Sequence, residues 1–517
     1  LEQLDRICVS REFHATPRMQ AFLRFCVEET LAGRADQLKG YTIALRVFGR
    51  GEDFDPAQDP IVRIQAGRLR RALERYYLVA GGRDPVVIDI PKGGYVPTFT
   101  RRPTPVAQAK PVQPLAGLSV PSIAVMPLED LTPDTTQGYF AAGLAEELVT
   151  ELNRYQDIAV VPCHRASPTQ GSAPDLTRMC REMGARFQLG GTVRRDATAA
   201  KISAWLVDTN DGRQVWTKTF KRSLAASDLI ETQEEIAASV VAALGSEHGV
   251  IVQRLAAESR KKRPSELSTY EAMLRYHSYQ IAPSPAVSGA CFEALQAAVD
   301  REPDYGPAWS ALATLFCQMY VYDAPGFENP LATGLTYAQK GVSLEPGRQL
   351  SRLILAYASL LEEAFDAFEA EAETALALNP NNPYATGSVG YLHVLAGDFD
   401  QGLRLLDRSV AANPIQPRWF SHGYYLAHFH DGDYQAALDA LNPGDDTEPW
   451  QPLLVAAARG KLGRPEEAAA SKAALLERKP DFGSRAHELL RRPVKCVDLV
   501  DGLIDGLEKA GVEIRES

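Results

Sequence analysis

Apolar residues in the first hundred positions recur at helical spacing and then at strand spacing. Residues 17–33 and 37–49 each carry an amphipathic helical pattern that ends at a glycine, which is a common helix stop. A third helical pattern covers 59–77, with Asp59 as its expected N-cap and Pro60 at the first helical position. Residues 86–99 then read as two short strands around a Pro-Lys-Gly-Gly turn. The pattern predicts three helices followed by a β-hairpin within residues 1–100.

Between residues 121 and 250, short apolar runs alternate with amphipathic stretches. Strands are expected at 122–128, 158–162, 187–196 and 200–223, the last with its own Asp-Gly turn. Helices are expected after the first strand at 138–155, after the second strand at 175–184, and at 227–245. This alternation predicts an α/β sandwich. The preceding residues 101–120 are rich in proline and predict an extended linker.

Residues 265–485 are repetitive. Pro346, Pro380 and Pro414 follow one another at intervals of 34 residues, between stretches of helical periodicity. A period of 34 residues is the signature of tetratricopeptide (TPR) repeats, which stack helix pairs into a superhelix with a concave groove. We expect that groove to receive a protein or peptide partner, and residues 486–517 to form C-terminal capping helices.

Composition places the chain among ordinary globular proteins of several domains. It has 517 residues, 45% of them hydrophobic and 23% charged, which is too long for one core and predicts three to four domains. No run of about 18 apolar residues predicts a membrane span. The seven cysteines show no C-x-x-C pair, which favours reduced thiols and a cytoplasmic location.

Charge is distributed unevenly along the chain. The formal net charge is -11, yet residues 1–102 hold 17 Lys and Arg against 13 Asp and Glu, a net charge of +4 that leaves -15 for the remainder. An acidic body repels a polyanion, so we expect any contact with nucleic acid to be confined to the N-terminal part.

The basic helix at 59–77 separates its residues by type around the helix axis. On a wheel of 100° per residue, Val62, Ala66, Leu69, Leu73 and Tyr76 form a core stripe. The opposite side carries arginines around an aliphatic residue, which suits guanine edges, phosphates and thymine methyl groups. A plain solvated face remains the alternative. The candidate DNA-binding residues are Arg63, Ile64, Gln65, Arg68, Arg70, Arg71, Arg75 and Lys92.

Patterns of catalytic residues are absent from the sequence. It has no phosphate-binding glycine loop, no nucleophile elbow and no H-E-x-x-H motif. His422, His428, His430 and Asp431 lie close together in the sequence and are candidates for a metal site, but residues 422 and 428 fall on different helix faces. We therefore expect no enzyme activity, no cofactor and no metal.

The N-terminal unit resembles the winged helix-turn-helix domain of OmpR/PhoB-type transcription regulators. The resemblance rests on "QLKGYTIALRVFG", "VRIQAGRLRRAL" and "VIDIPKGGYVPTF". It implies that Arg68 takes the principal base-reading position, that Arg63 and Gln65 face the groove, and that Arg70 and Arg71 lie beside phosphates. Gly67 and Pro91 depart from the family, and Lys92 substitutes for the usual arginine of the wing.

The second unit resembles the TolB-like amino-terminal domain, through "PSIAVMPLEDL", "GYFAAGLAEELVTEL", "GARFQLGGTVRR" and "ISAWLVDTNDGRQVWTKTF". The order of units is similar to that of HilA-like and SARP-like regulators. The resemblance implies a multidomain chain made of an α+β winged helix, an α/β TolB-like sandwich and an all-α TPR superhelix.

Two functional hypotheses follow. The first is a bacterial-type cytoplasmic transcription regulator that binds double-stranded DNA as a homodimer, while its other domains sense a ligand or protein. The second is a scaffold that does not bind DNA, in which the basic head contacts an acidic protein surface, including the chain's own acidic body.

Overall fold

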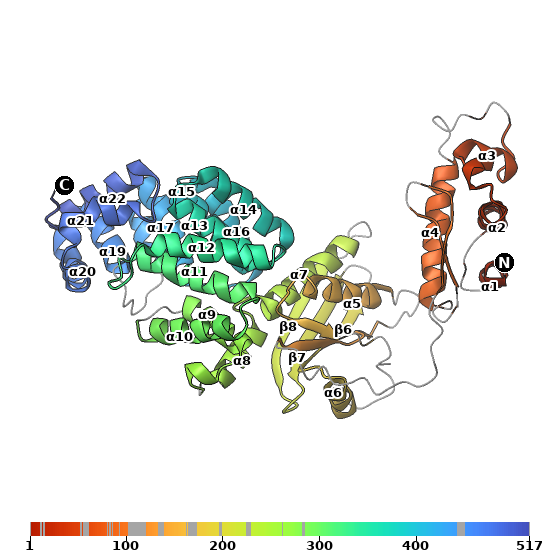
Figure 1. Ribbon diagram of the computed structural model, residues 1–517, viewed down its shortest axis with the longest axis horizontal. Coiled ribbons are helices and arrows are strands. Elements are labelled where there is room, and N and C mark those ends of the chain that lie inside the picture. Colours follow the sequence, from red (N-terminus) through yellow and green to blue (C-terminus); the bar gives the residue numbers. More distant parts are fainter. Residues whose placement is uncertain are drawn as a thin grey trace. The chain divides into compact units, whose positions relative to one another are not determined.

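The computed structural model describes the chain except for residues 1, 11–12, 14–15, 52–53, 55–60, 80, 82–83, 85, 92–93, 102–119, 133–138, 162, 164–172, 196–198, 224–228, 261, 282–284, 442–449 and 516–517. It divides into two compact units, Leu1–Val112 and Gln113–Ser517, which are described separately. The chain is mostly helical, with one two-stranded sheet and one mixed sheet (Figure 1). The expected helix start at Asp59 and Pro60 and the expected linker lie mainly outside the described residues.

The first unit, called the head, contains four α-helices and a hairpin among its described residues. The hairpin pairs its strands antiparallel, with Val86 opposite Arg101, as the sequence predicts. Two differences appear: the helix expected at 37–49 spans only seven residues, and an additional helix precedes it at the N-terminus. The elements are α1 (Glu2–Val9), α2 (Pro17–Leu31), α3 (Gly40–Arg46), α4 (Ile61–Val79), β1 (Val86–Asp89) and β2 (Thr98–Arg101).

Local sequence signals explain where α2 begins and ends. The Thr16 hydroxyl accepts a hydrogen bond from the backbone N–H of Met19 at 3.3 Å, and Pro17 occupies the first helical turn. Gly33 has φ of +77°, a conformation that side chains with a Cβ rarely adopt, so it turns the chain after the helix. The short α1 was not predicted, although its apolar residues lie on one side and Leu4 and Ile7 are fully buried.

The second unit begins with a mixed sheet, called here the sheet domain, whose strand order is β5-β3-β6-β7-β8. Parallel pairing joins β3 to β5 and β6, and antiparallel pairing joins β6, β7 and β8. This arrangement confirms the predicted alternation of strands and helices. The strands are β3 (Ser122–Val125), β4 (Glu129–Asp130), β5 (Ala159–Val161), β6 (Phe187–Arg195), β7 (Ala199–Asp208) and β8 (Gln214–Ser223).

Helices cover the two faces of the sheet unequally. Helices α5 (Tyr139–Leu152) and α7 (Leu229–Gly245) contribute to one large core with the inward side chains of β6, β7 and β8. Helix α6 (Ala173–Glu182) packs with residues of β3 and β5 in a separate, smaller core. The stretch Leu229–Ser259 is apolar enough to cross a membrane, but 67% of its most apolar window is buried inside the protein, as in a core helix.

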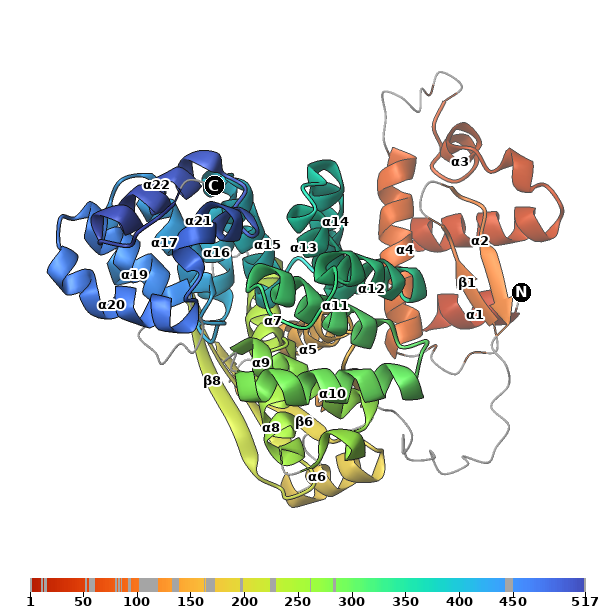
Figure 2. The ribbon, with the colours of Figure 1, turned by 60° about the vertical axis from the view of Figure 1, so that its left-hand side comes forward.

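Antiparallel helix pairs follow the sheet domain and are called here the helical array (Figures 1 and 2). Small residues sit where paired helices touch: a Cβ added to Gly390 would lie 2.8 Å from the carbonyl oxygen of Gly402. The pairs are α9 (Thr269–Ile281) with α10 (Pro285–Arg301), α11 (Gly306–Val321) with α12 (Pro330–Leu344), α13 (Gln349–Leu361) with α14 (Phe365–Leu378), α15 (Pro383–Ala396) with α16 (Phe399–Ala412), α17 (Phe420–His430) with α18 (Tyr434–Ala440), α19 (Trp450–Lys461) with α20 (Pro465–Arg478), and α21 (Phe482–Arg491) with α22 (Val497–Lys509).

The sheet domain and the helical array share one compact unit. Arg348 of the array pairs with Asp157 of the sheet domain, with 2.8 Å between Nη1 and Oδ1. Asn382 of the array donates to the Glu247 carboxylate that follows α7, at 3.1 Å. Helix α8 (Val250–Ser259) occupies the stretch of sequence between the two domains that are predicted at 121–250 and 265–485. These contacts join what the sequence predicts as separate domains.

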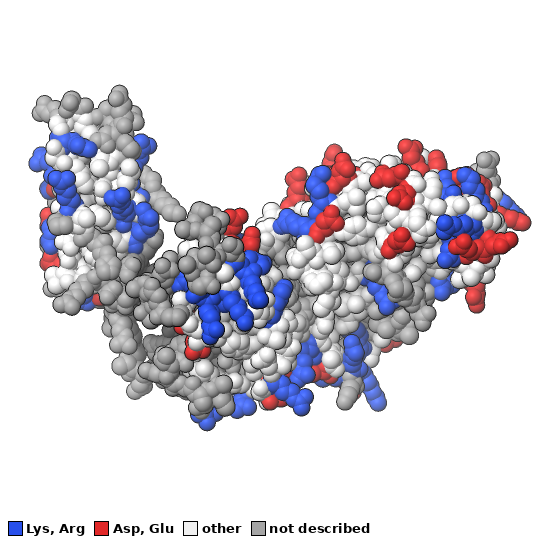
Figure 3. All heavy atoms as spheres, turned by 180° about the vertical axis from the view of Figure 1, so that it is seen from behind, with Lys and Arg blue, Asp and Glu red and all other residues white. Residues whose placement is uncertain are grey.

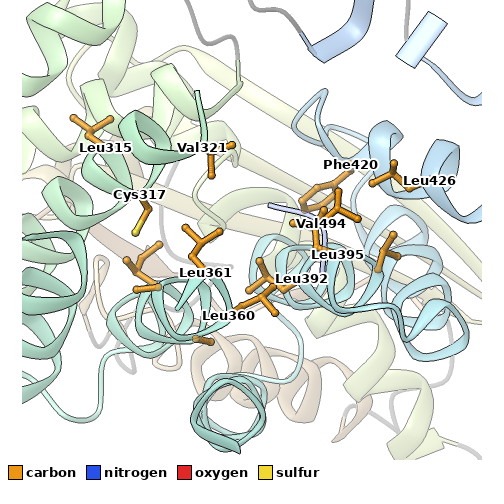
Figure 4. Packing of buried hydrophobic residues seen from close by; sticks show 14 of the residues in the cluster. Leu315, Cys317, Val321, Leu360, Leu361, Leu392, Leu395, Phe420, Leu426 and Val494 are labelled. Carbon is orange, nitrogen blue, oxygen red and sulfur yellow. The ribbon is translucent and has the colours of Figure 1, made fainter. Parts of the chain in front are cut away.

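The C-terminal segment folds back onto the array. Val494 lies close to Phe420 and Leu395 in the hydrophobic core (Figure 4). Arg492 donates to the carbonyl oxygen of Tyr320 at 2.7 Å and Lys495 to that of Leu361 at 3.1 Å, at the ends of α11 and α13. Cations suit these positions because the last carbonyls of a helix carry partial negative charge. The expected capping helices therefore also cover the ends of earlier helices.

An ionic group, called here the Asp323 cluster, joins the loop after α11 to the C-terminal helices of the array. The Asp323 carboxylate accepts from Arg485 at 2.5 Å, from Arg492 at 2.9 Å, and from Lys479. Hydrogen bonds, chiefly from Arg485, hold the pKa of Asp323 well below its usual range despite partial burial. The cluster thus links the loop after α11 to residues more than 150 positions later in the chain.

Candidate nucleic-acid interface

Helix α4 is anchored in the head through one face. Val62, Ala66, Leu69, Leu73 and Tyr76 are each at most 3% exposed, and they pack in the core of the head. This burial confirms the core stripe predicted from the helical wheel. A face fixed in this way holds the opposite side of the helix in one orientation toward solvent.

The opposite side of α4 carries exposed cations around an exposed isoleucine. Arg63, Arg68 and Arg71 are exposed, and Ile64 keeps 48% of its surface open. Within the described part of the head, none of the three arginines has an acidic partner. Arg71 Nε instead approaches the carbonyl oxygen of Gly67 in its own helix at 3.4 Å. The side chains therefore retain donors for an external anion.

Two further candidates occupy less open positions. Gln65 is half-buried, which leaves part of its amide at the surface of the same helix. Arg70 has a different arrangement: its Nε donates to the carbonyl oxygen of Ile90 and its Nη2 to that of Gly94, both at 2.8 Å. Arg70 thus binds the connection between β1 and β2 to α4. The side chain of Arg75 and residue Lys92 lie outside the described residues, so their predicted contacts remain predictions.

A second set of bonds fixes the C-terminal half of α4 to the hairpin. Tyr76 Oη donates to the Asp84 carboxylate at 2.6 Å, and the same carboxylate accepts from Arg6 at 3.1 Å and from Gln3. Burial raises the pKa of Asp84, but these hydrogen bonds outweigh burial and leave the pKa below its usual range. The backbone N–H of Ile88 donates to Tyr77 Oη at 2.7 Å.

The sequence did not predict these anchoring bonds. Asp84 and Gln3 are 81 residues apart, and no periodicity connects them. On the helical wheel Arg70 lies at the edge of the basic face. A residue at this position can bond either to the hairpin or to a phosphate, so the wheel does not distinguish the two roles. The available signal was indirect: a tyrosine pair near the end of α4, followed by an aspartate and a β-hairpin.

The other residues weighed in the sequence do not assemble a metal centre. Within the ranges described, no group of three or more His, Cys, Asp or Glu is placed to hold a metal ion. Burial lowers the pKa of His422 to about 4, and His430 stacks on the ring of Phe399 at 4.2 Å. The seven cysteines are free thiols. The exposed side of α4 is therefore the site with the clearest chemistry.

Comparison with known proteins gives a partial match. No protein-family model matches the chain. A stretch of 144 residues, 28% of this chain, is 34% identical to a protein of Rhizobium meliloti (strain 1021) named putative adenylate cyclase 3, of which it covers 24%. The chain thus matches about a quarter of the length of that relative.

Solved structures give only weak similarity. A PelC dodecamer from Paraburkholderia phytofirmans is 20% identical, with 24% of this chain and 86% of that chain covered and a TM-score of 0.19. Lipoprotein GNA1162 from Neisseria meningitidis is 18% identical, with 20% and 82% covered and a TM-score of 0.18. TolB from Acinetobacter baumannii is 17% identical, with 23% and 27% covered and a TM-score of 0.17. At these TM-scores the similarities carry no argument.

Proposed function

We propose that the chain is a DNA-binding transcription regulator that reads duplex DNA with α4. The observation that carries the proposal is the exposed group of Arg63, Arg68 and Arg71, which has no acidic partner in the described head, on a helix whose other face is fixed in a core. Guanidinium groups fork onto guanine O6 and N7 or onto phosphates, and Ile64 between them suits a thymine methyl group.

The order of elements in the head supports a winged helix-turn-helix of the OmpR/PhoB type. Helices precede α4, and an antiparallel hairpin follows it. In such domains the helix enters the major groove and the hairpin lies near the adjacent backbone. Arg70 would then act mainly by holding the hairpin against the helix, and Lys92 would reach the backbone.

The second unit supports a role in sensing and assembly. The mixed sheet with its helices is compatible with a TolB-like domain, and helix pairs with a 34-residue spacing are typical of TPR repeats. We propose that this unit receives a ligand or a protein partner. Since Arg492 and Lys495 already cover the ends of α11 and α13, a partner peptide would bind elsewhere on the array.

We propose a homodimer on DNA, because one recognition helix reads one half-site and useful affinity usually needs two. Sedimentation of the full chain with a selected duplex should give two chains per duplex. One chain per duplex at saturating protein would refute the dimer and leave DNA recognition by α4 intact.

We also propose that the chain regulates without catalysing a reaction. The relative named putative adenylate cyclase 3 shares only part of its length with this chain, and the catalytic motifs sought in the sequence are missing. Incubating the full chain with ATP and Mg²⁺ or Mn²⁺ should yield no cyclic AMP above a heat-denatured control. Steady production that scales with protein concentration would show an enzyme.

The function is tested by selecting duplexes from a random pool with the full chain. We expect enrichment of a short motif, and interference with binding when guanine N7 in the motif is methylated. The Arg68→Ala variant should lose that interference at one guanine, as expected for a bidentate contact. If the full chain enriches no motif and binds no duplex at low salt, the scaffold hypothesis replaces the regulator, and the basic face becomes a site for acidic protein.

A further inference from the structure

The strands β6, β7 and β8 have one face that no helix covers in the described part of the sheet domain. Alternate residues of these strands point into the core with α5 and α7, among them Ile202, Ala204 and Leu206. The residues between them point the other way. On that side α6 reaches only the start of β6, where Thr177 donates to Gln188 at 2.9 Å. The remainder is called here the open face.

Three cations form a row across the open face. In the sheet register Arg194 lies opposite Lys201, and Lys201 lies opposite Lys221. All three are exposed, and none has an ionic partner within the described ranges. Like charges directly opposite each other on neighbouring strands destabilise a sheet. A row that is unfavourable for folding, and whose cations form no ion pair in the described residues, favours the binding of an external anion.

The neighbouring row is polar and carries one carboxylate, the exposed Glu129 of β4, which lies opposite Thr192. Thr192, Ser203 and Thr219 follow in register, and the hydroxyls of Ser203 and Thr219 lie 3.2 Å apart. Beyond them Trp205 lies over Gly190, where an added Cβ would come within 2.9 Å of the indole Nε1. Trp205 therefore packs over the sheet backbone. Hydroxyls beside cations are typical of surfaces that contact phosphate and sugar.

The shape and composition of this surface favour one class of partner. Figure 3 shows lysine and arginine side chains gathered over the sheet domain. Small-molecule sites are usually concave, whereas this site is the face of a sheet. Protein interfaces have cores depleted in charge and enriched in aromatic residues, whereas this face is centred on three cations. A repeating polyanion matches both features.

We propose that the open face binds the phosphodiester backbone of duplex DNA without regard to sequence, as a second contact in addition to α4. The proposal departs from the expectation based on net charge, because the local row of cations on the open face, and not the negative total of the second unit, would meet the phosphates. The proposal rests on the proposed function of the head, because it takes the same duplex as partner. Once one surface holds the duplex, the other meets it at a raised effective concentration, since both belong to one chain. The open face then adds affinity, and α4 adds specificity.

The test compares four full-length proteins on one duplex across a salt titration: the wild type, the face variant Arg194→Gln/Lys201→Gln/Lys221→Gln, the head variant Arg68→Ala/Arg71→Ala, and the control Arg260→Gln/Arg404→Gln/Arg418→Gln. The control removes three exposed cations outside both surfaces. Each lost phosphate contact should lessen the slope of log K against log salt by about 0.9. We expect a slope change of about 2 to 3 for the face variant and none for the control.

The face variant should fold normally, because removing three adjacent like charges relieves repulsion in the sheet. Its affinity should fall equally for specific and random duplexes. An unchanged slope overturns the inference and leaves the head untouched. A head variant that binds like wild type overturns the proposed function instead. If the face variant keeps duplex binding but loses affinity for single-stranded DNA or for polyglutamate, the partner is that polymer and the proposal is wrong.

Discussion

The exposed arginines of α4 and the arginines of the Asp323 cluster carry the same guanidinium group but differ in whether acidic side chains surround it. Arg63, Arg68 and Arg71 are exposed without an acidic partner in the described head, whereas Arg485 and Arg492 converge on Asp323. Both stretches read as charge-rich amphipathic helix in the sequence. The presence or absence of acidic partners distinguishes the two groups. The paired arginines stabilise the array, and the arginines without acidic partners keep donors that can bind an external anion.

The largest expected effect comes from removing the shared acid of the paired group. Asp323→Ala removes the one carboxylate that Lys479, Arg485 and Arg492 all contact, and leaves them only Asp481 and Glu488 as acidic partners. Breaking a buried pair costs about 3–5 kcal/mol, and the partial exposure of this cluster reduces that to about 2–3 kcal/mol of unfolding free energy. Urea unfolding followed by circular dichroism measures it, with Asp400→Ala, an exposed acid in α16, as control. Equal stability of the two variants would contradict a structural role.

Arg70 lies on α4 but, unlike the exposed arginines of that helix, it is hydrogen-bonded to another part of the head, so we expect it to have a structural role. Arg70→Ala removes two hydrogen bonds to the backbone of the β1–β2 connection and should destabilise the head by about 1–2 kcal/mol. Hydrogen exchange of the hairpin amides reports the loss, and Arg63→Ala is the control on the same helix. If Arg70→Ala lowers DNA affinity while the hairpin stays protected, Arg70 contacts DNA directly.

Acid should weaken the Asp323 cluster, because its arginines and lysine are paired with carboxylates. Hydrogen bonds, chiefly from Arg485, lower the pKa of Glu488 from 4.5 to about 2, and the pKa of Asp323 is also lowered. A carboxylate with a lowered pKa stabilises the fold above its unfolded pKa, and that contribution disappears as the pH falls through the folded pKa. The array should therefore lose stability between about pH 4.5 and 2. In Asp323→Ala this loss should be smaller, and an identical acid profile would show that the cluster is not responsible.

Ile64 is expected to give the smallest effect. It is 48% exposed, so Ile64→Ala should change the unfolding free energy by less than about 0.5 kcal/mol. If its methyl groups meet thymine, the variant should weaken binding by about 1 kcal/mol on the selected motif and less on the same duplex with uracil in place of thymine. Equal losses on both duplexes would remove Ile64 from base recognition.

Much of the architecture could be predicted from local patterns. The core stripe of α4, the hairpin, the succession of strands and helices along the sheet domain and the helix pairs of the array follow from periodicity and turn residues, because those signals lie within a few residues. The order of the strands within the sheet was not predicted. The resemblance implies a phosphate-side position for Arg70, and no local pattern predicts its bonds to Ile90 and Gly94, which come 20 and 24 residues later. The Asp323 cluster and the contact between Arg348 and Asp157 also join distant positions that no local pattern connects.

The most direct test of the contrast between paired and unpaired arginines is the salt dependence of duplex binding by the full chain. Arg68→Ala/Arg71→Ala removes two unpaired arginines of α4, and Arg404→Ala/Arg418→Ala removes two exposed arginines of the array. We predict that the first pair lessens the slope of log K against log salt by about 2 with no change in thermal stability, and that the second pair leaves the slope unchanged. Equal slopes for the two variants would contradict the assignment of α4 to DNA.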